Sequence, residues 1–315
     1  MIDQNLVWIL FFVFIVSMLA LDLGVFNRKA HEVKPKEALK IWLFWVSLAV
    51  VFNALVFYWY GADKGLEFTT GYVMEEALSV DNMFVFILIF SYFAVPKEDQ
   101  HKVLFYGVLG ALVFRGIFIF AGIAVVQQFD WVIYIFGAFL IFTAIKIAIK
   151  KEDSEVHPDH NIMVRGFRKI FRVTPDYEGA KFFVWKNEVL MATPLFVALL
   201  VVESTDIVFA VDSVPAIIAI TQDPFIVYTS NAFAILGLRA LYFLLASVVS
   251  LFCYLKYGLA AILAFVGSKM LLVSVGLHIP VFMSLAIIAI ILGVTILASW
   301  LKNKGQKTCP PPEHH

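Results

Sequence analysis

Apolar residues form nine long stretches in this chain of 315 residues, and polar connectors separate them. A helix that crosses a bilayer needs about 20 mostly apolar residues, and each stretch is close to or beyond that length. The stretches cover residues 6–26, 38–60, 67–95, 103–126, 130–149, 190–220, 225–255, 257–276 and 279–301. The pattern predicts an all-α fold: a polytopic membrane helix bundle with about nine transmembrane helices.

Basic residues collect in every second connector between these stretches, and Lys64 alone departs from the alternation. The basic connectors are 27–40, 97–102, 150–188, the turn at Lys256 and the tail from Lys302. Because basic connectors stay on the cytoplasmic side, we expect an outside N-terminus and a cytoplasmic C-terminus. The chain is therefore expected to cross its membrane several times.

Composition supports this class and excludes others. The chain is 62% hydrophobic and 15% charged, whereas soluble domains are about half apolar and about a quarter charged. This apolar composition makes the lipid bilayer the expected partner. The formal net charge is +0, so no nucleic-acid partner is expected. The two cysteines, Cys253 and Cys309, provide neither a disulfide framework nor a cluster of soft metal ligands.

Three of the apolar stretches carry carboxylates away from their ends, which a lipid-facing helix tolerates poorly because each costs about 3 kcal/mol at the bilayer centre. Away from the ends of the apolar stretches there are seven acidic side chains and at most four basic ones, so the excess negative charge requires bound cations or protons. The acids are Asp22, Glu75, Glu76, Asp81, Glu203, Asp206 and Asp212, and the bases are Arg115, Lys146, Arg239 and Lys269.

Helical spacing places several of these oxygens on common faces. At about 100° per residue, Glu75, Ser79 and Asn82 share one face of the third helix. Asp206 and Ser213 share the corresponding face of the sixth helix, and Glu203 lies one turn before Asp206. Such oxygen ligands suit hard divalent ions, namely Mg²⁺, Ca²⁺ and Mn²⁺. The spacing therefore predicts a metal site between the two acidic helices.

Asp81 and Asp212 point away from these faces on ideal helices, and two interpretations remain open. Local unwinding can bring them into the site, since Pro215 removes a helical hydrogen bond near Asp212. Alternatively, each pairs with Arg115 or Arg239 on a neighbouring helix.

The remaining charged groups allow similar alternatives. Asp22 belongs to the metal site or is hydrated near the membrane interface. Lys146 and Lys269 either form ion pairs or extend to the interface along their apolar stems.

An internal repeat relates helices three to five to helices six to eight. Glu75 and Asp81 are six residues apart, as are Asp206 and Asp212, and Arg115 corresponds to Arg239. Each unit has three spans, so the two copies would have opposite orientations, an arrangement found in transporters with sites near the bilayer midplane.

The predicted organisation has six segments. They are an N-terminal helix pair (1–60), a first three-helix repeat (61–150), a cytoplasmic basic loop (151–189), a second, inverted three-helix repeat (190–276), a last helix (277–301) and a disordered tail (302–315).

The acidic stretches, residues 75–82 and 203–216, resemble the two signature motifs of the TerC/Alx family of integral membrane proteins. Residues 20–26 and 232–242 add to the resemblance, which extends over about residues 6–301. It implies a bacterial-type protein of the plasma (inner) membrane whose family is linked to manganese efflux, with the acidic motif residues at the ion site. Mn²⁺ is thus the expected substrate, with Ca²⁺ or Mg²⁺ as alternatives.

The leading hypothesis is an exporter of divalent cations that works by alternating access, with or without coupling to protons, and is not an enzyme. An intramembrane aspartyl protease would use two carboxylates, but its Gly-x-Gly-Asp motif is absent. The alternative is a non-transporting membrane partner that supplies metal to secreted proteins or scaffolds a metal or tellurite stress complex.

Overall fold

The computed structural model describes residues 4–21, 34–129, 131–149, 167, 171–186, 188–246, 254–273, 277 and 279–305. Long helices dominate these residues, which confirms the predicted all-α membrane bundle. The helices are α1 (Gln4–Leu21), α2 (Pro35–Tyr60), α3 (Ala62–Tyr92), α4 (Lys97–Gln128), α5 (Val132–Ile149), α7 (Pro194–Ile218), α8 (Pro224–Ala246), α9 (Leu255–Leu272) and α10 (Val281–Gly305).

Six of these helices are long and apolar enough to cross a membrane by length and composition: α2, α4, α5, α7, α8 and α10. The apolar parts of α1 and α9 are shorter. Helix α3 has 31 residues and contains the first acidic motif in its middle. Its charged residues explain why hydropathy alone does not select it as a span.

Proline and glycine set several helix boundaries. Pro35 and Pro194 occupy the first turns of α2 and α7, where a missing N–H costs no helical hydrogen bond. Gly61, with φ of +89°, makes the turn between α2 and α3. The sixth apolar stretch was predicted to start at residue 190, whereas α7 begins at Pro194.

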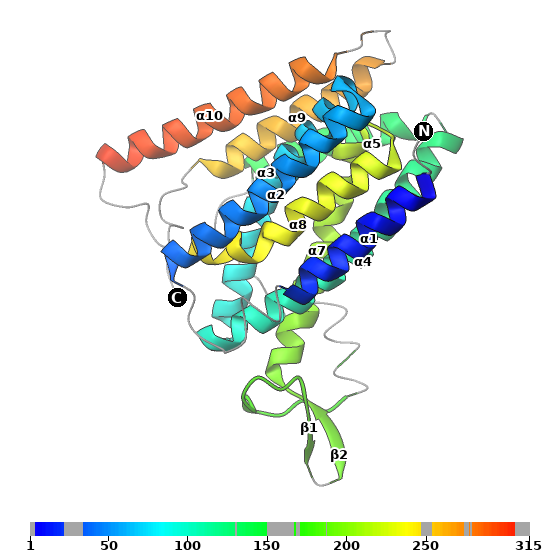
Figure 1. The fold of residues 1–315 in the computed structure, drawn as a ribbon. Helices are drawn as coiled ribbons and strands as arrows, with labels where there is room; N and C mark the ends of the chain where they lie inside the picture. The colour runs from blue at the N-terminus through cyan, green and yellow to red at the C-terminus, as the bar shows by residue number, and fades with distance from the viewer. Residues whose placement is uncertain are drawn as a thin grey trace.

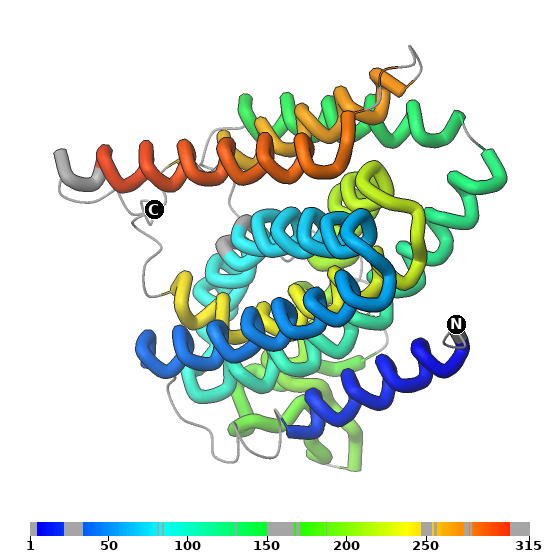
Figure 2. The backbone as a smooth tube through the Cα atoms, turned by 45° about the horizontal axis from the view of Figure 1, so that its top comes forward, coloured from blue at the N-terminus to red at the C-terminus, as the bar shows by residue number. Residues whose placement is uncertain are grey.

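The helices pack in three main pairs: α3 with α8, α4 with α7, and α5 with α9. Figure 2 shows α5, α9 and α10 together along one side of the molecule and α1 on the opposite side. Exchanging α3–α5 with α7–α9 would leave this set of pairs unchanged. The packing is compatible with an inverted repeat, which stays a prediction.

Glycines allow the backbones of α5 and α9 to meet. A Cβ added to Gly267 would lie 2.7 Å from the Gly137 carbonyl oxygen, and one added to Gly137 would lie 3.0 Å from the Gly267 carbonyl oxygen. Small residues at such crossings permit close helix contact within a membrane, where the hydrophobic effect does not drive helices together.

A β-hairpin precedes α7 and projects beyond the end of the bundle (Figure 1). Its antiparallel strands are β1 (Phe183–Lys186) and β2 (Val189–Ala192), with Val184 opposite Met191. The predicted all-α fold contained no strand, and residues 151–189 were expected to form a basic loop, so this hairpin is a departure from that expectation.

The segment before the hairpin is tied to the bundle. The Tyr177 hydroxyl donates a hydrogen bond of 2.6 Å to the Phe93 carbonyl oxygen after α3. Burial, with a smaller contribution from the Asp99 carboxylate, raises the pKa of Tyr177 to about 12. The phenol therefore stays protonated and able to donate at physiological pH.

Candidate cation site

Three helices bring two acids and one arginine together inside the bundle. Arg115 of α4 forms an ion pair through Nη1 with Glu75 Oε1 of α3. Its Nε and Nη2 donate to the two carboxylate oxygens of Asp206 of α7, at 3.3 and 3.0 Å. The exposed fractions are 0% for Arg115, 2% for Glu75 and 5% for Asp206. We call these three residues the buried triad.

Each residue of the triad lies near the middle of its helix, many residues from either end. The predicted approach of Glu75 and Asp206 is therefore observed, although the two residues are 131 positions apart in the sequence. The observed partners of Arg115 also differ from the predicted alternative, in which the arginines pair with Asp81 or Asp212.

Polar atoms without partners accompany the triad on the same helices. Ser79 and Asn82 of α3 and Ser213 of α7 are all buried. In the part of the chain that the structure describes, neither serine hydroxyl nor the amide nitrogen of Asn82 has a hydrogen-bond partner. Buried polar groups are normally satisfied, so these atoms indicate that a ligand or water belongs beside them.

A third acid, Glu203, lies one turn before Asp206 and interacts electrostatically with it. The Glu203 carboxylate rests against Gly110 of α4, where an added Cβ would lie 2.1–2.3 Å from its atoms. Its Oε2 has no hydrogen-bond partner among the described residues. The absence of a side chain at Gly110 therefore makes room for an additional carboxylate near the triad.

A small cavity of about 10 Å³, room for about one water molecule, opens beside Asp206. Arg239 of α8 lines it together with Asp206, and most of its other walls are apolar, among them Met83, Leu104 and Val202. Arg239 is buried, and its guanidinium carbon lies 5.8 Å from the centre of the Phe105 ring. The second predicted arginine thus approaches the same site from α8.

Glu76 does not join the triad, although the sequence had placed it among the metal ligands. It accepts a hydrogen bond of 2.9 Å from the Tyr72 hydroxyl. Its Oε1 lies close to Gly237 of α8, where an added Cβ would be 3.5 Å away. Glu76 thus faces α8 at Gly237, whereas its neighbour Glu75 reaches Arg115 of α4.

Asp212 is likewise directed elsewhere. It accepts a hydrogen bond of 3.2 Å from Thr143 of α5 and interacts electrostatically with Lys146 on the same helix. Lys146 is exposed, which fits either predicted role, extension to the interface or pairing. Pro215 lies within α7, which continues as a helix to Ile218, so the local unwinding considered for Asp212 is not observed.

The remaining predicted site residues are only partly placed. Lys269 of α9 is 8% exposed and interacts electrostatically with Glu67 of α3. Asp22 and the side chain of Asp81 lie outside the described part of the structure.

The conformation of the described residues is that of an ion-paired site. Among them, no three histidine, cysteine or acidic side chains converge closely enough to hold a metal ion. Glu75 and Asp206 instead share the guanidinium of Arg115. The donor chemistry suits a hard cation, but the position between the two carboxylates is taken by an arginine.

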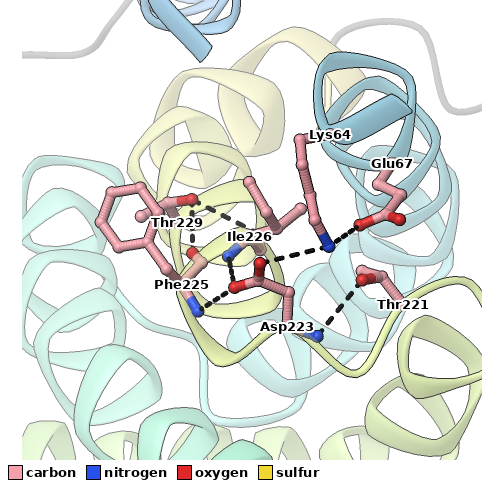
Figure 3. A network of polar contacts seen from close by, with 7 residues as sticks. All are labelled: Lys64, Glu67, Thr221, Asp223, Phe225, Ile226 and Thr229. Carbon is pink, nitrogen blue, oxygen red and sulfur yellow. Dashed lines mark hydrogen bonds and ion pairs between the residues drawn. The ribbon is translucent and has the colours of Figure 1, made fainter. Parts of the chain in front are cut away.

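A second ionic network at one end of α3 was not anticipated from the sequence (Figure 3). Lys64 lies 2.8 Å from Glu67 Oε2 and 3.2 Å from Asp223 Oδ2. Asp223 also accepts hydrogen bonds from the backbone N–H groups of Phe225 and Ile226 at the start of α8. The Asp223–Pro224 sequence is a typical helix start and could have revealed the cap, though not the lysine. We call Lys64, Glu67 and Asp223 the terminal network.

Comparison with known proteins agrees with these features. The sequence model of the "Integral membrane protein TerC family" matches residues 60–307. The chain is 50% identical over 301 residues to an uncharacterized membrane protein of Myxococcus xanthus, covering 96% of this chain and 94% of that protein.

It is 49% identical over 317 residues to a protein of Escherichia coli (strain K12) named as the membrane-bound redox modulator Alx, covering 97% of this chain and 98% of that one. An uncharacterized membrane protein of Rickettsia bellii is 42% identical over 299 residues, with coverage of 94% and 97%. No solved structure matches the chain. The length of the family match and the extent of these identities show that the chain belongs to the TerC family of integral membrane proteins.

Proposed function

We propose that this chain is a transporter that exports a divalent cation, Mn²⁺ in the first place, from the cytoplasm across the plasma membrane. The observation that carries the proposal is the convergence of Glu75 and Asp206 on one buried position in the middle of the bundle. Arg115 balances only one of these two buried negative charges, so the position keeps an excess negative charge that a bound divalent cation would compensate.

Two further features support cation binding. The unpartnered hydroxyls of Ser79 and Ser213 provide neutral oxygen ligands on the same two helices. The carboxylate of Glu203 lies one turn from Asp206. The ligand chemistry does not distinguish Mn²⁺ from Ca²⁺ or Mg²⁺, and the family resemblance is what favours manganese.

In the proposed cycle, the cation enters from the cytoplasm, binds between α3 and α7, and leaves on the outside when the two halves rock against each other. The pairing of α3 with α8 and of α4 with α7 supports this scheme, because each half packs against the other through equivalent helices. The proposed topology has an outside N-terminus and a cytoplasmic C-terminus. The chain performs no chemical conversion in this scheme.

Cellular manganese accumulation tests the proposal. Cells that lack their own exporters are loaded with Mn²⁺ and express the wild-type chain, Asp206→Asn or Asp223→Asn. Asp206→Asn should leave cellular manganese as high as in cells without the transporter, because the substitution removes one charge from the buried position. Asp223→Asn is the matched control, since asparagine also caps helices and the residue lies in the terminal network. Wild-type efflux by Asp206→Asn would reject the site.

The alternative is a membrane partner that supplies metal to secreted proteins or scaffolds a metal or tellurite stress complex. The exposed hairpin favours it, because Trp185 is 72% exposed at a position outside the bundle. Purified protein in liposomes separates the two functions. A transporter moves Mn²⁺ across the bilayer without any other protein, whereas a scaffold moves none.

A further inference from the structure

Arg115 occupies the position at which the proposed function, on which this inference rests, places the cation. We propose that Arg115 is an internal counter-ion of the empty carrier, which the metal displaces when it binds. The guanidinium neutralises Glu75 and Asp206 while no metal is present. It thereby allows the empty carrier to return across the membrane.

The geometry of the guanidinium carries the first step. Arg115 contacts both oxygens of Asp206 and one oxygen of Glu75, so it spans the space between the two carboxylates. A divalent ion bound by both acids would need oxygens within about 2.0–2.6 Å of its centre. Arginine and metal therefore cannot occupy this position together, and one must leave before the other binds.

Charge and burial carry the second step. Arg115 is completely buried, and an arginine side chain does not lose its proton inside a protein. It therefore neutralises one of the two negative charges of Glu75 and Asp206, whereas a divalent cation neutralises both. Because Arg115 is part of the chain, its guanidinium has a high effective concentration at the two carboxylates. A divalent metal ion can still replace it, because its charge is larger.

The consequence concerns the return of the empty carrier. Moving two bare carboxylates through the membrane interior is costly, because an uncompensated buried charge is strongly unfavourable. With Arg115 in place, the carrier can change conformation either loaded with metal or paired with arginine. Without it, only the metal-loaded carrier changes conformation readily, and net transport stops while exchange of metal across the membrane continues.

The experiment compares net flux with exchange in liposomes that contain the purified full-length protein. Radioactive Mn²⁺ is followed into a manganese-free compartment and, separately, into one that contains saturating unlabelled Mn²⁺. In Arg115→Gln we expect net flux to fall by about tenfold or more, while exchange stays within about threefold of wild type. The affinity of detergent-solubilised protein for Mn²⁺ should rise about tenfold, because the internal competitor is gone.

Two variants complete the design. Lys64→Gln removes a basic side chain of the terminal network and should change neither flux. Arg115→Lys keeps the charge but loses the planar fork that binds Asp206 through two nitrogens. It should bind Mn²⁺ more tightly than wild type and less tightly than Arg115→Gln.

The melting temperature with and without Mn²⁺ provides a second measurement if Arg115→Gln folds poorly. Mn²⁺ should raise its melting temperature more than that of the wild type, because only the metal then neutralises the two acids. If Arg115→Gln does not fold even with Mn²⁺ present, the affinity of Arg115→Lys for Mn²⁺, compared with that of the wild type, tests the inference.

The inference is overturned by an equal loss of exchange and net flux in a folded variant, or by a lower Mn²⁺ affinity in Arg115→Lys. If the wild-type protein shows neither flux nor exchange, the proposed function fails, which is a different result.

Discussion

The buried triad and the terminal network each consist of one basic and two acidic side chains, but they differ in how far water reaches them. Each places one basic side chain between two acids from different parts of the chain. In the buried triad the side chains are 0–6% exposed, whereas in the terminal network they are 33% exposed for Lys64, 16% for Glu67 and 28% for Asp223. The two groups of residues therefore differ mainly in the solvent exposure of their side chains.

This difference distinguishes charged residues that stabilise the fold from charged residues that serve function. At the end of α3, water and salt screen each charge, and Asp223 has the additional role of capping α8. In the middle of the bundle, neutral residues of similar size would pack as well or better, because ion pairs seldom repay their desolvation. The buried triad is thus better explained by function than by stability.

The largest expected effect is that of Arg115→Met. It removes the shared counter-ion and leaves Glu75 and Asp206 buried without compensation, so the free energy of unfolding should fall by about 3–5 kcal/mol. Equilibrium unfolding in mixed detergent micelles, in the absence of divalent metal, measures this change.

A triple variant gives the control for that loss. Replacing Glu75 and Asp206 with glutamine and asparagine in the Arg115→Met background removes all three charges. Stability should then recover most of the way to wild type, because no unpaired charge remains. Continued instability would mean that the shape of Arg115, and not its charge, holds the helices together.

The sequence predicted the helices and two residues of the buried triad, but not the terminal network. Each of the nine predicted apolar stretches corresponds to one helix of the described structure. The helical spacing of the acidic residues indicated that Glu75 and Asp206 share a site. The arginine partner was not predictable, because it depends on how α4 packs against α3 and α7. Arg115 is in contact with Glu75 and Asp206, whereas one of the two interpretations left open by the sequence paired the arginines with Asp81 and Asp212.

The structure also shows where helical spacing is insufficient. Glu75 and Glu76 are adjacent in one motif, yet one contacts Arg115 and the other Tyr72. Consecutive helical residues point about 100° apart, and the neighbouring helices decide which of them enters a site. The hairpin before α7 was missed because its second strand reads as the start of the next apolar stretch.

An intermediate effect is expected where the surroundings of the buried triad are altered without removing a charge. In Gly110→Ala the new methyl group would occupy the position of the Glu203 carboxylate, which must move. We expect a loss of about 1–3 kcal/mol in the free energy of unfolding, typical of overpacking, together with weaker Mn²⁺ binding. Unfolding and Mn²⁺ titration of the same purified protein measure both.

Gly293→Ala is the matched control, since nothing lies within 4 Å of an added Cβ at that position of α10. It should leave Mn²⁺ binding unchanged. If Gly110→Ala behaved in the same way, Glu203 would not belong to the site.

The smallest effect is expected from Lys64→Met in the terminal network. Lys64 is partly exposed, so losing its ion pairs with Glu67 and Asp223 should change the free energy of unfolding by about 0.2–1 kcal/mol. The change should shrink further when unfolding is repeated in about 1 M salt, because screening already weakens these pairs in the wild type. The effect of Arg115→Met should remain nearly constant, since salt does not reach the buried triad. A Lys64→Met loss above about 2 kcal/mol that salt leaves unchanged would show that the terminal network is shielded from water, and solvent access would no longer distinguish the two regions.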